Sequence, residues 1–112
     1  MDDFSVQSER RDKVTVVAVS GRVDSVTAAT LDEELAKVVR DNKKVVLDLK
    51  NVSYLSSAGV RAILRASQTA QKSGGGVKLS QVPSLVLEVL DNVGVTQVLK
   101  PFSTVDEAVA GF

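Results

Sequence analysis

The sequence predicts a mixed α/β fold, and three observations lead to this prediction. Residues 4–9 and 14–20 alternate or run apolar and include β-branched side chains, and they are separated by the charged break Arg10–Lys13, as expected for a hairpin. Further along, short apolar runs alternate with longer segments whose apolar residues recur every three or four positions. The 112 residues suffice for one hydrophobic core and are too few for two. We therefore expect one domain over residues 1–112, with a mixed sheet that opens with a hairpin and continues through right-handed strand–helix crossovers.

In the first half of the chain, the hairpin is followed by a helix and a central strand. Residues 27–41 carry apolar side chains at helical spacing, and Thr27 is the expected N-cap. The apolar run Lys43–Leu49 is typical of a strand buried on both faces. A loop is expected after it, at Asn51 and Ser53.

The second half continues the alternation of helices and strands. Its expected elements, in order, are a helix that follows Ser56 and Ser57 and ends at Gly74, a strand at residues 77–80, a helix that starts near Pro83 and ends near Gly94, a strand at residues 95–100 and a helix within residues 103–112. Proline suits the first turn of a helix because it has no N–H to leave unpaired there. Ser103 or Thr104 can cap the last helix.

The charge and hydropathy of the chain exclude two classes of partner. Lys and Arg number 14, as do Asp and Glu, and neither sign forms a block, so we expect no direct contact with nucleic acid. The longest apolar runs fall far below the roughly 20 residues that span a bilayer, so we expect no membrane insertion. The first ten residues, MDDFSVQSER, are acidic and polar rather than signal-like, which makes the cytoplasm the expected location.

The absence of histidine and cysteine narrows the possible chemistry. It removes disulfides, thiolate nucleophiles, the commonest zinc ligands and Ser-His-Asp catalysis. We therefore expect neither an enzyme nor a metal or cofactor site. The glycines at 74–76 follow a helix and precede a strand, the reverse of a phosphate loop, and are interpreted as a turn. The run Asp32–Glu34 is interpreted as the acidic first turn of a helix rather than as a metal cluster.

Two adjacent serines, Ser56 and Ser57, stand between the central strand and the second helix, where open α/β sheets commonly place their sites. One interpretation is a helix cap, in which a hydroxyl accepts a hydrogen bond from a first-turn N–H. The other is phosphorylation. A phosphate at a helix N-terminus gains roughly 0.3–1 kcal/mol from the helix dipole, whereas about two added negative charges disrupt an apolar or acid-lined partner contact. Position alone leaves both interpretations open.

Three segments resemble the bacterial anti-sigma factor antagonists, the single-domain members of the STAS family. VTVVAVSGRVDSVTAATLDEEL resembles the family's opening strand, Gly-x-x-Asp turn and first helix, and KKVVLDLKNVSYLSSAGVRAIL its central strand, loop and helix. The tail GVKLSQVPSLVLEVLDNVGVTQVLKPFSTVDEAV keeps the order of strand, Pro-initiated helix, short strand and closing helix. The resemblance implies a STAS-like mixed β-sheet with about four helices packed on one face.

The resemblance also implies a modification site. The family motif is usually Asp-Ser-Ser/Thr/Ala-Gly, phosphorylated on the first serine after the acidic residue. By position, Ser57 is then the phosphorylated residue, followed by Ala58 and Gly59, while Ser56 replaces the acidic residue and is a competing acceptor. The residues expected to contact a partner are Asp24, Ser56, Ser57, Ala58, Gly59 and Arg61.

Two of the charged positions keep alternative interpretations. Asp24 matches the family's turn aspartate, which is compatible with ordering the turn before the first helix as well as with contacting a partner. Arg61 and Arg65 lie one turn apart on the second helix. They are compatible with a solvated face, with contacts to acidic groups of a partner, and with support of a phosphate.

The function that the resemblance implies is partner switching. The unmodified protein binds an anti-sigma factor that is itself a serine kinase and so frees the sigma factor for transcription. The kinase then uses ATP to phosphorylate Ser57, which releases the antagonist, and a metal-dependent serine phosphatase restores it. In this scheme the chain is a substrate and a binding module, not an enzyme.

Two other classes compete with this prediction. STAS domains also serve as accessory subunits of transporters, including lipid-trafficking complexes, on the cytoplasmic face of a membrane protein. A small hydrolase or nucleotide-binding enzyme is the third class, and it is disfavoured because the chain has no imidazole, no thiol and no phosphate loop in the required topology. The identity of a co-purifying kinase or transporter ATPase distinguishes the first two classes.

Overall fold

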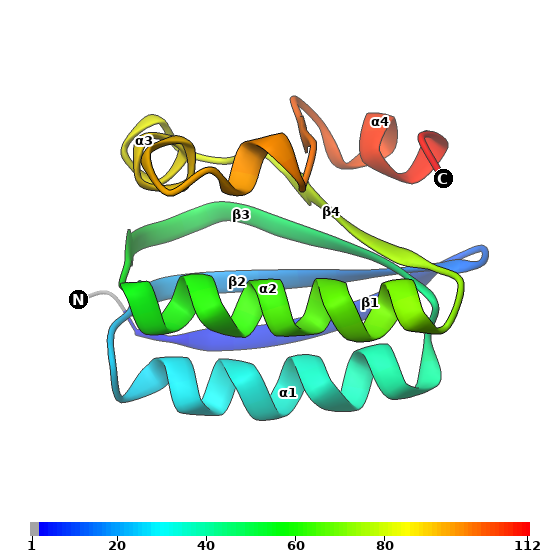
Figure 1. Ribbon diagram of the computed structural model, residues 1–112, viewed down its shortest axis with the longest axis horizontal. Coiled ribbons are helices and arrows are strands. Elements are labelled where there is room, and N and C mark those ends of the chain that lie inside the picture. The colour runs from blue at the N-terminus through cyan, green and yellow to red at the C-terminus, as the bar shows by residue number, and fades with distance from the viewer. Residues whose placement is uncertain (1–2) are drawn as a thin grey trace.

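The computed structural model describes residues 3–112 and contains a five-stranded mixed sheet (Figure 1). Its strands, in spatial as well as chain order, are β1 (Ser5–Arg11), β2 (Val14–Val23), β3 (Lys44–Leu55), β4 (Gly76–Ser80) and β5 (Pro101–Phe102). β1 and β2 form an antiparallel hairpin, and the later neighbours pair in parallel. The predicted mixed α/β fold with an opening hairpin is confirmed.

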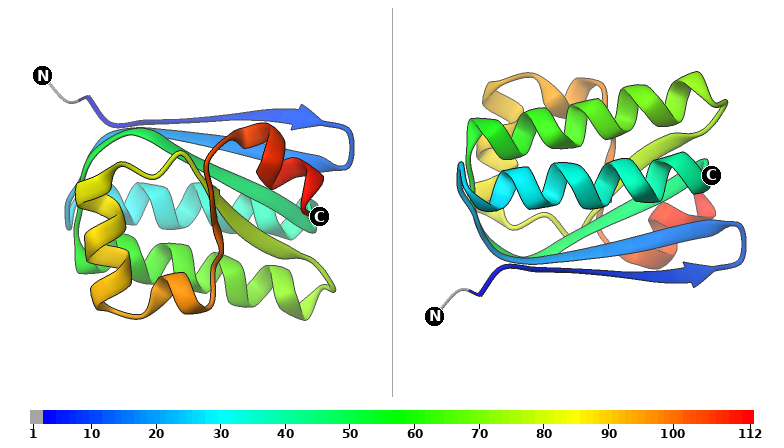
Figure 2. Two further views of the ribbon diagram at one scale, coloured as in Figure 1. Left: turned by 90° about the horizontal axis from the view of Figure 1, so that it is seen from above. Right: turned by 90° about the horizontal axis from the view of Figure 1, so that it is seen from below.

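Four α-helices and one short 3₁₀-helix connect and cover the strands. They are α1 (Thr27–Asp41), α2 (Ser57–Lys72), α3 (Ser84–Asn92), the 3₁₀-helix η1 (Val95–Gln97) and α4 (Val105–Ala110). α1 and α2 lie side by side on one face of the sheet, as the views in Figure 1 and Figure 2 agree. α3 packs against the part of β3 that extends beyond its pairing with β4.

The sheet buries apolar residues on both faces, and this corrects the expectation that all helices pack on one face. On β2, Val17 and Val19 belong to the large core with α1, α2 and α3, whereas Val14 and Val16 point to the other side. There they form a second cluster with Ala108 of α4. Because successive residues of a strand alternate between faces, a strand with a continuous apolar run needs a cover on each side. α4 supplies the second cover (Figure 1).

β3 is longer than the sequence predicts, and the loop expected at Asn51 and Ser53 is wrong. The strand continues to Leu55 because the second half of β2 runs beside it, pairing Ser20 with Asn51 and Val23 with Leu55. Polar side chains in this extension are exposed while Val52 and Leu55 are buried. A polar residue on the outer face does not end a strand whose backbone is still paired.

The short strand expected at residues 95–100 is also wrong. Residues 95–97 form the 3₁₀-helix η1, and the strand β5 comes later, at Pro101–Phe102. Gly94 precedes η1 with φ 80°, a left-handed conformation that favours glycine. The N–H of Leu99 donates to the carbonyl of Val95 at 2.8 Å. This turn of the backbone lets the side chains of Val95 and Leu99 both reach the core, where they are buried.

The glycines at 74–76 form the predicted turn between α2 and β4. Gly74 has φ 87°, and the N–H of Gly75 donates to the carbonyl of Ala70 at 2.9 Å, an arrangement that ends α2. Gly75 lies so close to β3 that a Cβ on it would be 1.8 Å from the carbonyl oxygen of Lys43. These glycines therefore allow the turn after α2 to pack closely against the backbone of β3.

We expect Gly75→Ala to lower the free energy of unfolding by about 2–3 kcal/mol, because the added methyl group meets backbone that cannot move without breaking the β3–β4 pairing. Gly76→Ala is the matched control, since its Cβ would make only an ordinary contact, 3.7 Å from the Phe112 ring. Urea unfolding followed by circular dichroism measures both. Equal effects of the two substitutions would contradict this account.

Candidate functional site

The candidate site lies at the end of the sheet where β2 and β3 finish and α1 and α2 begin. Because β2 and β3 are parallel, their carboxyl ends meet at one edge of the sheet. The turn after β2 carries Asp24, and the turn after β3 carries Ser56 and Ser57. The two turns are joined directly, since the N–H of Ser56 donates to the carbonyl of Val23 at 2.8 Å.

Asp24 orders the turn that enters α1. Its Oδ1 accepts hydrogen bonds from the backbone N–H groups of Val26 and Thr27, each at 2.9 Å. The Thr27 hydroxyl in turn accepts from the N–H of Asp24 at 2.9 Å and donates to the carbonyl of Arg22 at 2.8 Å. The expectation that Thr27 is the N-cap is thus wrong: Thr27 is the first residue of α1, and Asp24 satisfies the free N–H groups.

The hydrogen bonds to Asp24 also favour its charged form. The backbone N–H of Thr27 lowers the pKa of this carboxyl most, with further contributions from the Thr27 side chain, the Val26 N–H and the charge of Arg22. Arg22 is 4.0 Å from the carboxylate. The structural interpretation of Asp24, a carboxylate that orders its turn, is therefore supported by geometry and electrostatics together.

The structure separates the two serines: one caps the helix and the other has an accessible hydroxyl. Ser56 is the N-cap of α2, with an extended backbone conformation, and its Oγ accepts from the N–H of Gly59 at 3.2 Å. Ser57 is the first residue of the helix and is exposed. Within residues 3–112, its hydroxyl has no hydrogen-bond partner. Capping thus occupies Ser56 and leaves the hydroxyl of Ser57 accessible.

The cap also explains why serine can stand where the family motif has an acidic residue. Serine and aspartate are both strong N-cap residues, because each has a side-chain oxygen that can accept a hydrogen bond from a first-turn N–H. Ser56 therefore keeps the hydrogen bond to the N–H of Gly59 and removes only the negative charge.

Gly59 fits the first turn of α2 onto the ends of two strands. A Cβ at this position would lie 2.7 Å from Cγ1 of Val23 and 2.6 Å from Cδ1 of Leu55, and both of these side chains are buried in the core. Gly59 is itself buried, whereas Ala58 is partly exposed. Gly59 therefore lets the first turn of α2 approach the strand ends closely and so determines where the two serines lie. It affects a partner surface by positioning these serines rather than by contacting the partner.

Arg61 and Arg65 have different surroundings. Arg65 donates to Asp32 of α1 at 3.0 Å and so links the two helices. Arg61 lies one turn after Ser57, is exposed and forms no ion pair with any residue of the 3–112 range. Asp32 lies in the second turn of α1, so the interpretation of Asp32–Glu34 as an acidic first turn is wrong. No group of acidic side chains in residues 3–112 is arranged to hold a metal ion.

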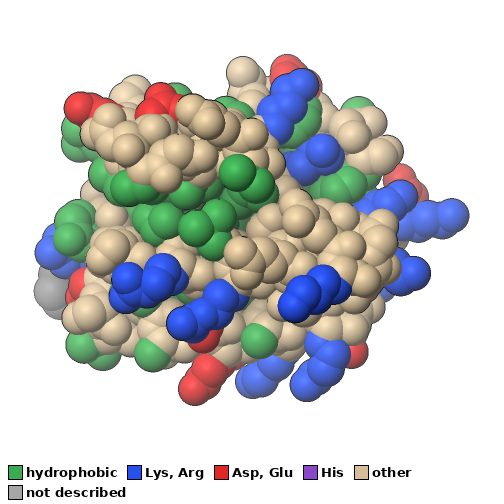
Figure 3. All heavy atoms as spheres, in the orientation of Figure 1, with side chains coloured by type: hydrophobic (Ala, Val, Ile, Leu, Met, Phe, Trp, Pro, Cys, Tyr) green, Lys and Arg blue, Asp and Glu red, His purple; other side chains and the backbone are tan. Residues whose placement is uncertain are grey.

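Exposed apolar side chains surround the site, and sequence reasoning missed them. Val26, in the turn with Asp24, is 77% exposed, and Tyr54, just before the serines, is stacked under Arg22 at 4.1 Å from the guanidinium carbon to the ring centre. Along α3 and the residue that follows it, a stripe of three exposed apolar residues recurs every fourth position: Leu85, Val89 and Val93. Figure 3 shows hydrophobic side chains gathered between α3 and α2.

The number of apolar residues in and next to α3 could have revealed this exposed surface from the sequence. α3 and the residue after it carry apolar residues at 85, 86, 87, 89, 90 and 93, more than one buried face of a nine-residue helix can use. Val86 and Leu90 face the core and Leu87 is partly buried, which leaves Leu85, Val89 and Val93 outside. Together, Val26, Tyr54 and the α3 stripe form what we call the apolar rim. Exposed apolar residues that cluster in this way mark interaction surfaces.

The fold and the position of the two serines agree with a comparison with known families, in which the model for the STAS domain matches residues 5–108. The chain belongs to the STAS domain family. None of the helices formed by residues 3–112 has the length and apolar character needed to cross a membrane.

Proteins similar to the chain include several antagonists of anti-sigma factors. It is 31% identical to the anti-sigma-F factor antagonist RsfB of Mycobacterium tuberculosis, over 98% of this chain and 90% of that protein. A crystal structure of an anti-sigma factor antagonist from Mycobacterium paratuberculosis superposes with a TM-score of 0.89, 26% identity and coverage of 97% and 93% of the two chains. The unphosphorylated form of the anti-sigma factor antagonist SpoIIAA shares the fold, with a TM-score of 0.80, 18% identity and coverage of 96% and 98%.

We expect the stabilising effect of Asp24 to depend on pH. The pKa of this carboxyl is lower in the folded protein, so its stabilisation is fully present above its ordinary pKa of about 3.9 and is lost as the pH falls through the lowered folded value. Asp24→Ala should lower Tm at pH 7, and the difference from the parent should shrink below about pH 4.

Thermal unfolding by circular dichroism between pH 7 and pH 2.5 checks this expectation. Asp24→Asn is the matched control, because it keeps an acceptor oxygen for the N–H groups of Val26 and Thr27 but has no titrating charge. A Tm difference between Asp24→Ala and the parent that stays constant over this pH range would refute the role of the charge.

Gly59→Ala should destabilise the protein by about 1–3 kcal/mol, although alanine is the better helix former by about 1 kcal/mol, because the methyl group overlaps Val23 and Leu55. The neighbouring substitution Ser57→Ala, at an exposed position, serves as the control and should change stability by less than about 0.5 kcal/mol. Urea midpoints compare the two. A stabilised Gly59→Ala variant would show that the close packing is not limiting.

Proposed function

We propose that this protein is an anti-sigma factor antagonist that acts by partner switching. In its unmodified form it binds an anti-sigma factor that is a serine kinase, and it thereby frees the sigma factor. Phosphorylation of Ser57 releases it, and a serine phosphatase returns it to the binding form. The chain acts in this cycle as a binding module and a kinase substrate in the cytoplasm. Similarity to RsfB over nearly the whole length of both chains supports this assignment.

The observation that carries the proposal is the division of roles between the two serines. A hydroxyl that serves as an N-cap is engaged with the backbone, whereas the hydroxyl of Ser57 is exposed on the first residue of α2. A kinase can therefore modify Ser57 without breaking the cap at Ser56. The fold should tolerate the phosphate, because negative charge at a helix N-terminus is favourable.

The same phosphate strongly affects a bound partner. About two negative charges placed within an apolar contact surface impose a desolvation cost and repel acidic groups of the partner. In this proposal the contact surface consists of Asp24, Ser56, Ser57, Ala58 and Arg61, positioned by Gly59 and bordered by the apolar rim. In the same proposal Arg61, one helical turn beyond Ser57 and without an acidic partner among residues 3–112, meets a carboxylate of the kinase before modification and the phosphate after it.

Ser57→Ala should bind the kinase constitutively and resist modification. Ser57→Glu should fold normally and bind the kinase with an affinity reduced by about tenfold or more. The measurement is affinity for each serine-kinase anti-sigma factor of the same source, by calorimetry, with circular dichroism as the check on folding. Ser56→Ala tests the competing acceptor, because it removes the capping hydroxyl and leaves the hydroxyl of Ser57 in place. Equal affinities of the parent, Ser57→Ala and Ser57→Glu would rule out the switch.

Intact-mass analysis and peptide mapping after incubation with ATP and the same kinases identify the modified residue. A single phosphate on Ser57 supports the proposal, and a phosphate on Ser56 contradicts the assignment of the serines. If no kinase modifies the protein and a transporter ATPase co-purifies with it, the accessory-subunit function replaces the one proposed here.

A further inference from the structure

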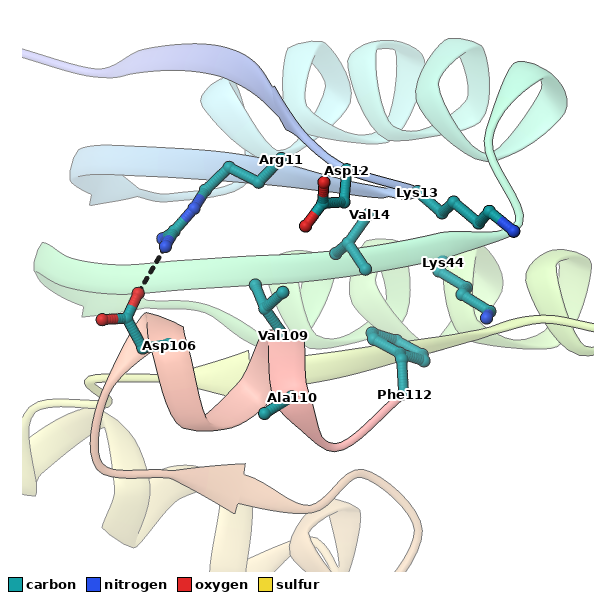
Figure 4. A pocket seen from close by; sticks show the side chains of 9 residues that line it. All are labelled: Arg11, Asp12, Lys13, Val14, Lys44, Asp106, Val109, Ala110 and Phe112. Atoms are coloured by element: carbon teal, nitrogen blue, oxygen red, sulfur yellow. Dashed lines mark hydrogen bonds and ion pairs between the residues drawn. The ribbon is translucent and has the colours of Figure 1, made fainter.

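A cavity of about 670 Å³ lies at the end of the molecule opposite Ser57, between the β1–β2 hairpin and α4 (Figure 4). Its size falls within the range of pockets that hold small molecules, about 300–1,000 Å³. The residues that line it come from the hairpin, the start of β3 and the last helix: Arg11, Asp12, Lys13, Val14, Lys44, Asp106, Val109, Ala110 and Phe112. None of these residues belongs to the candidate site.

The floor of the cavity is apolar. Val14 and Val109 point toward each other from the sheet and from α4, and the Phe112 ring lies beside them (Figure 4). The ring is in contact with Lys78, whose Nζ is 4.7 Å from the ring centre. This cation–π contact orients an aromatic surface that is only partly buried.

The charged groups of the cavity leave an excess of cations. Arg11 and Asp106 form an ion pair across one side and so neutralise each other (Figure 4). Asp12, at the hairpin turn, is the other carboxylate of the lining. Lys13 and Lys44 have no ion-pair partner among residues 3–112, and the strand register places Lys44 beside Val14 at the cavity floor.

The topology gathers more cations at this end. Parallel strands begin here and α1 and α2 finish here, so residues distant in the sequence come together, as the right-hand end of Figure 3 shows. Eight of the 14 Lys and Arg residues of the chain belong to these segments: Arg10, Arg11, Lys13, Arg40, Lys43, Lys44, Lys72 and Lys78. The carboxylates of Glu9, Asp12, Asp41 and Asp106 at the same end offset about half of this charge, so the neutral net charge of the chain conceals an end with a net positive charge, which attracts anions.

We propose that this cavity binds a small organic anion with an apolar body, of the monocarboxylate class. The apolar part packs on Val14, Val109 and Phe112, and the carboxylate lies between the ammonium groups of Lys13 and Lys44. The apolar floor distinguishes this ligand from a polyanion or a flat anionic surface, which would meet only the cations. The site lies apart from Ser57 and does not rest on the proposed function.

The test is an NMR titration of the full chain with octanoate, with octanol and inorganic phosphate as probes of the apolar and the charged part alone. Saturable octanoate binding with a Kd of about 1 mM or tighter, with methyl shifts at Val14 and Val109 and weaker binding of both other probes, is the expected result. The absence of saturable octanoate binding up to about 10 mM would overturn the proposal, as would equal binding of octanol or phosphate.

Three variants separate this site from general attraction to the positive end. The double substitution of Lys13→Met and Lys44→Met should weaken octanoate binding about fivefold to tenfold, the effect of losing two exposed charge contacts. Lys72→Met, at the same end but outside the cavity, is the matched control and should bind like the parent. Ala110→Trp, at an exposed position of the lining, should fill the cavity and abolish binding. Binding that survives Ala110→Trp, or that Lys72→Met weakens as much as the double variant, would contradict the assignment.

Discussion

The packing of the first turn of α2 onto the ends of β2 and β3 is the constraint on which the candidate site depends. Gly59 permits a contact with Val23 and Leu55 that any side chain would obstruct, and the backbone of Ser56 is bonded to Val23. These contacts place two hydroxyls at the rim of the sheet. The cap then engages the hydroxyl of Ser56 and leaves that of Ser57 exposed. A chemical modification can therefore change the surface without changing the core that supports it.

The parallel part of the sheet gives the molecule two unlike ends. Strands that run in one direction bring their carboxyl ends, with Asp24 and the serines, to one edge, where the N-termini of α1 and α2 add partial positive charge. The strand starts and helix ends, with most of the lysines, meet at the other edge. The apolar rim borders only the first of these ends, and the cavity under α4 lies at the second. The proposed partner surface and the proposed small-molecule site are thereby separated in space.

The elements that were predicted well are those whose signal is local. α1, α2 and α3 have apolar residues at helical spacing, and Thr104 caps α4 by accepting from the N–H of Glu107. The failures arose where a distant segment decides the outcome. Residues 51–55 look like a loop but pair with β2, residues 95–97 turn into a 3₁₀-helix so that Val95 and Leu99 reach the core, and α4 covers the face opposite α1 and α2. Local propensity is a weak prior when tertiary contacts oppose it.

For the candidate site, the sequence by itself determined the chemistry that is available: a serine pair at a strand–helix junction, a glycine two residues beyond Ser57, and no histidine or cysteine for catalysis or metal binding. It also determined the family through its motifs. Only the tertiary structure decided which serine is the cap, that Asp24 bonds to the start of α1, and that Arg65 is paired with Asp32 while Arg61 is not. The physical reason is that a side chain's partners are set by neighbours in space. Those neighbours exist only after the sheet and the helices have packed together.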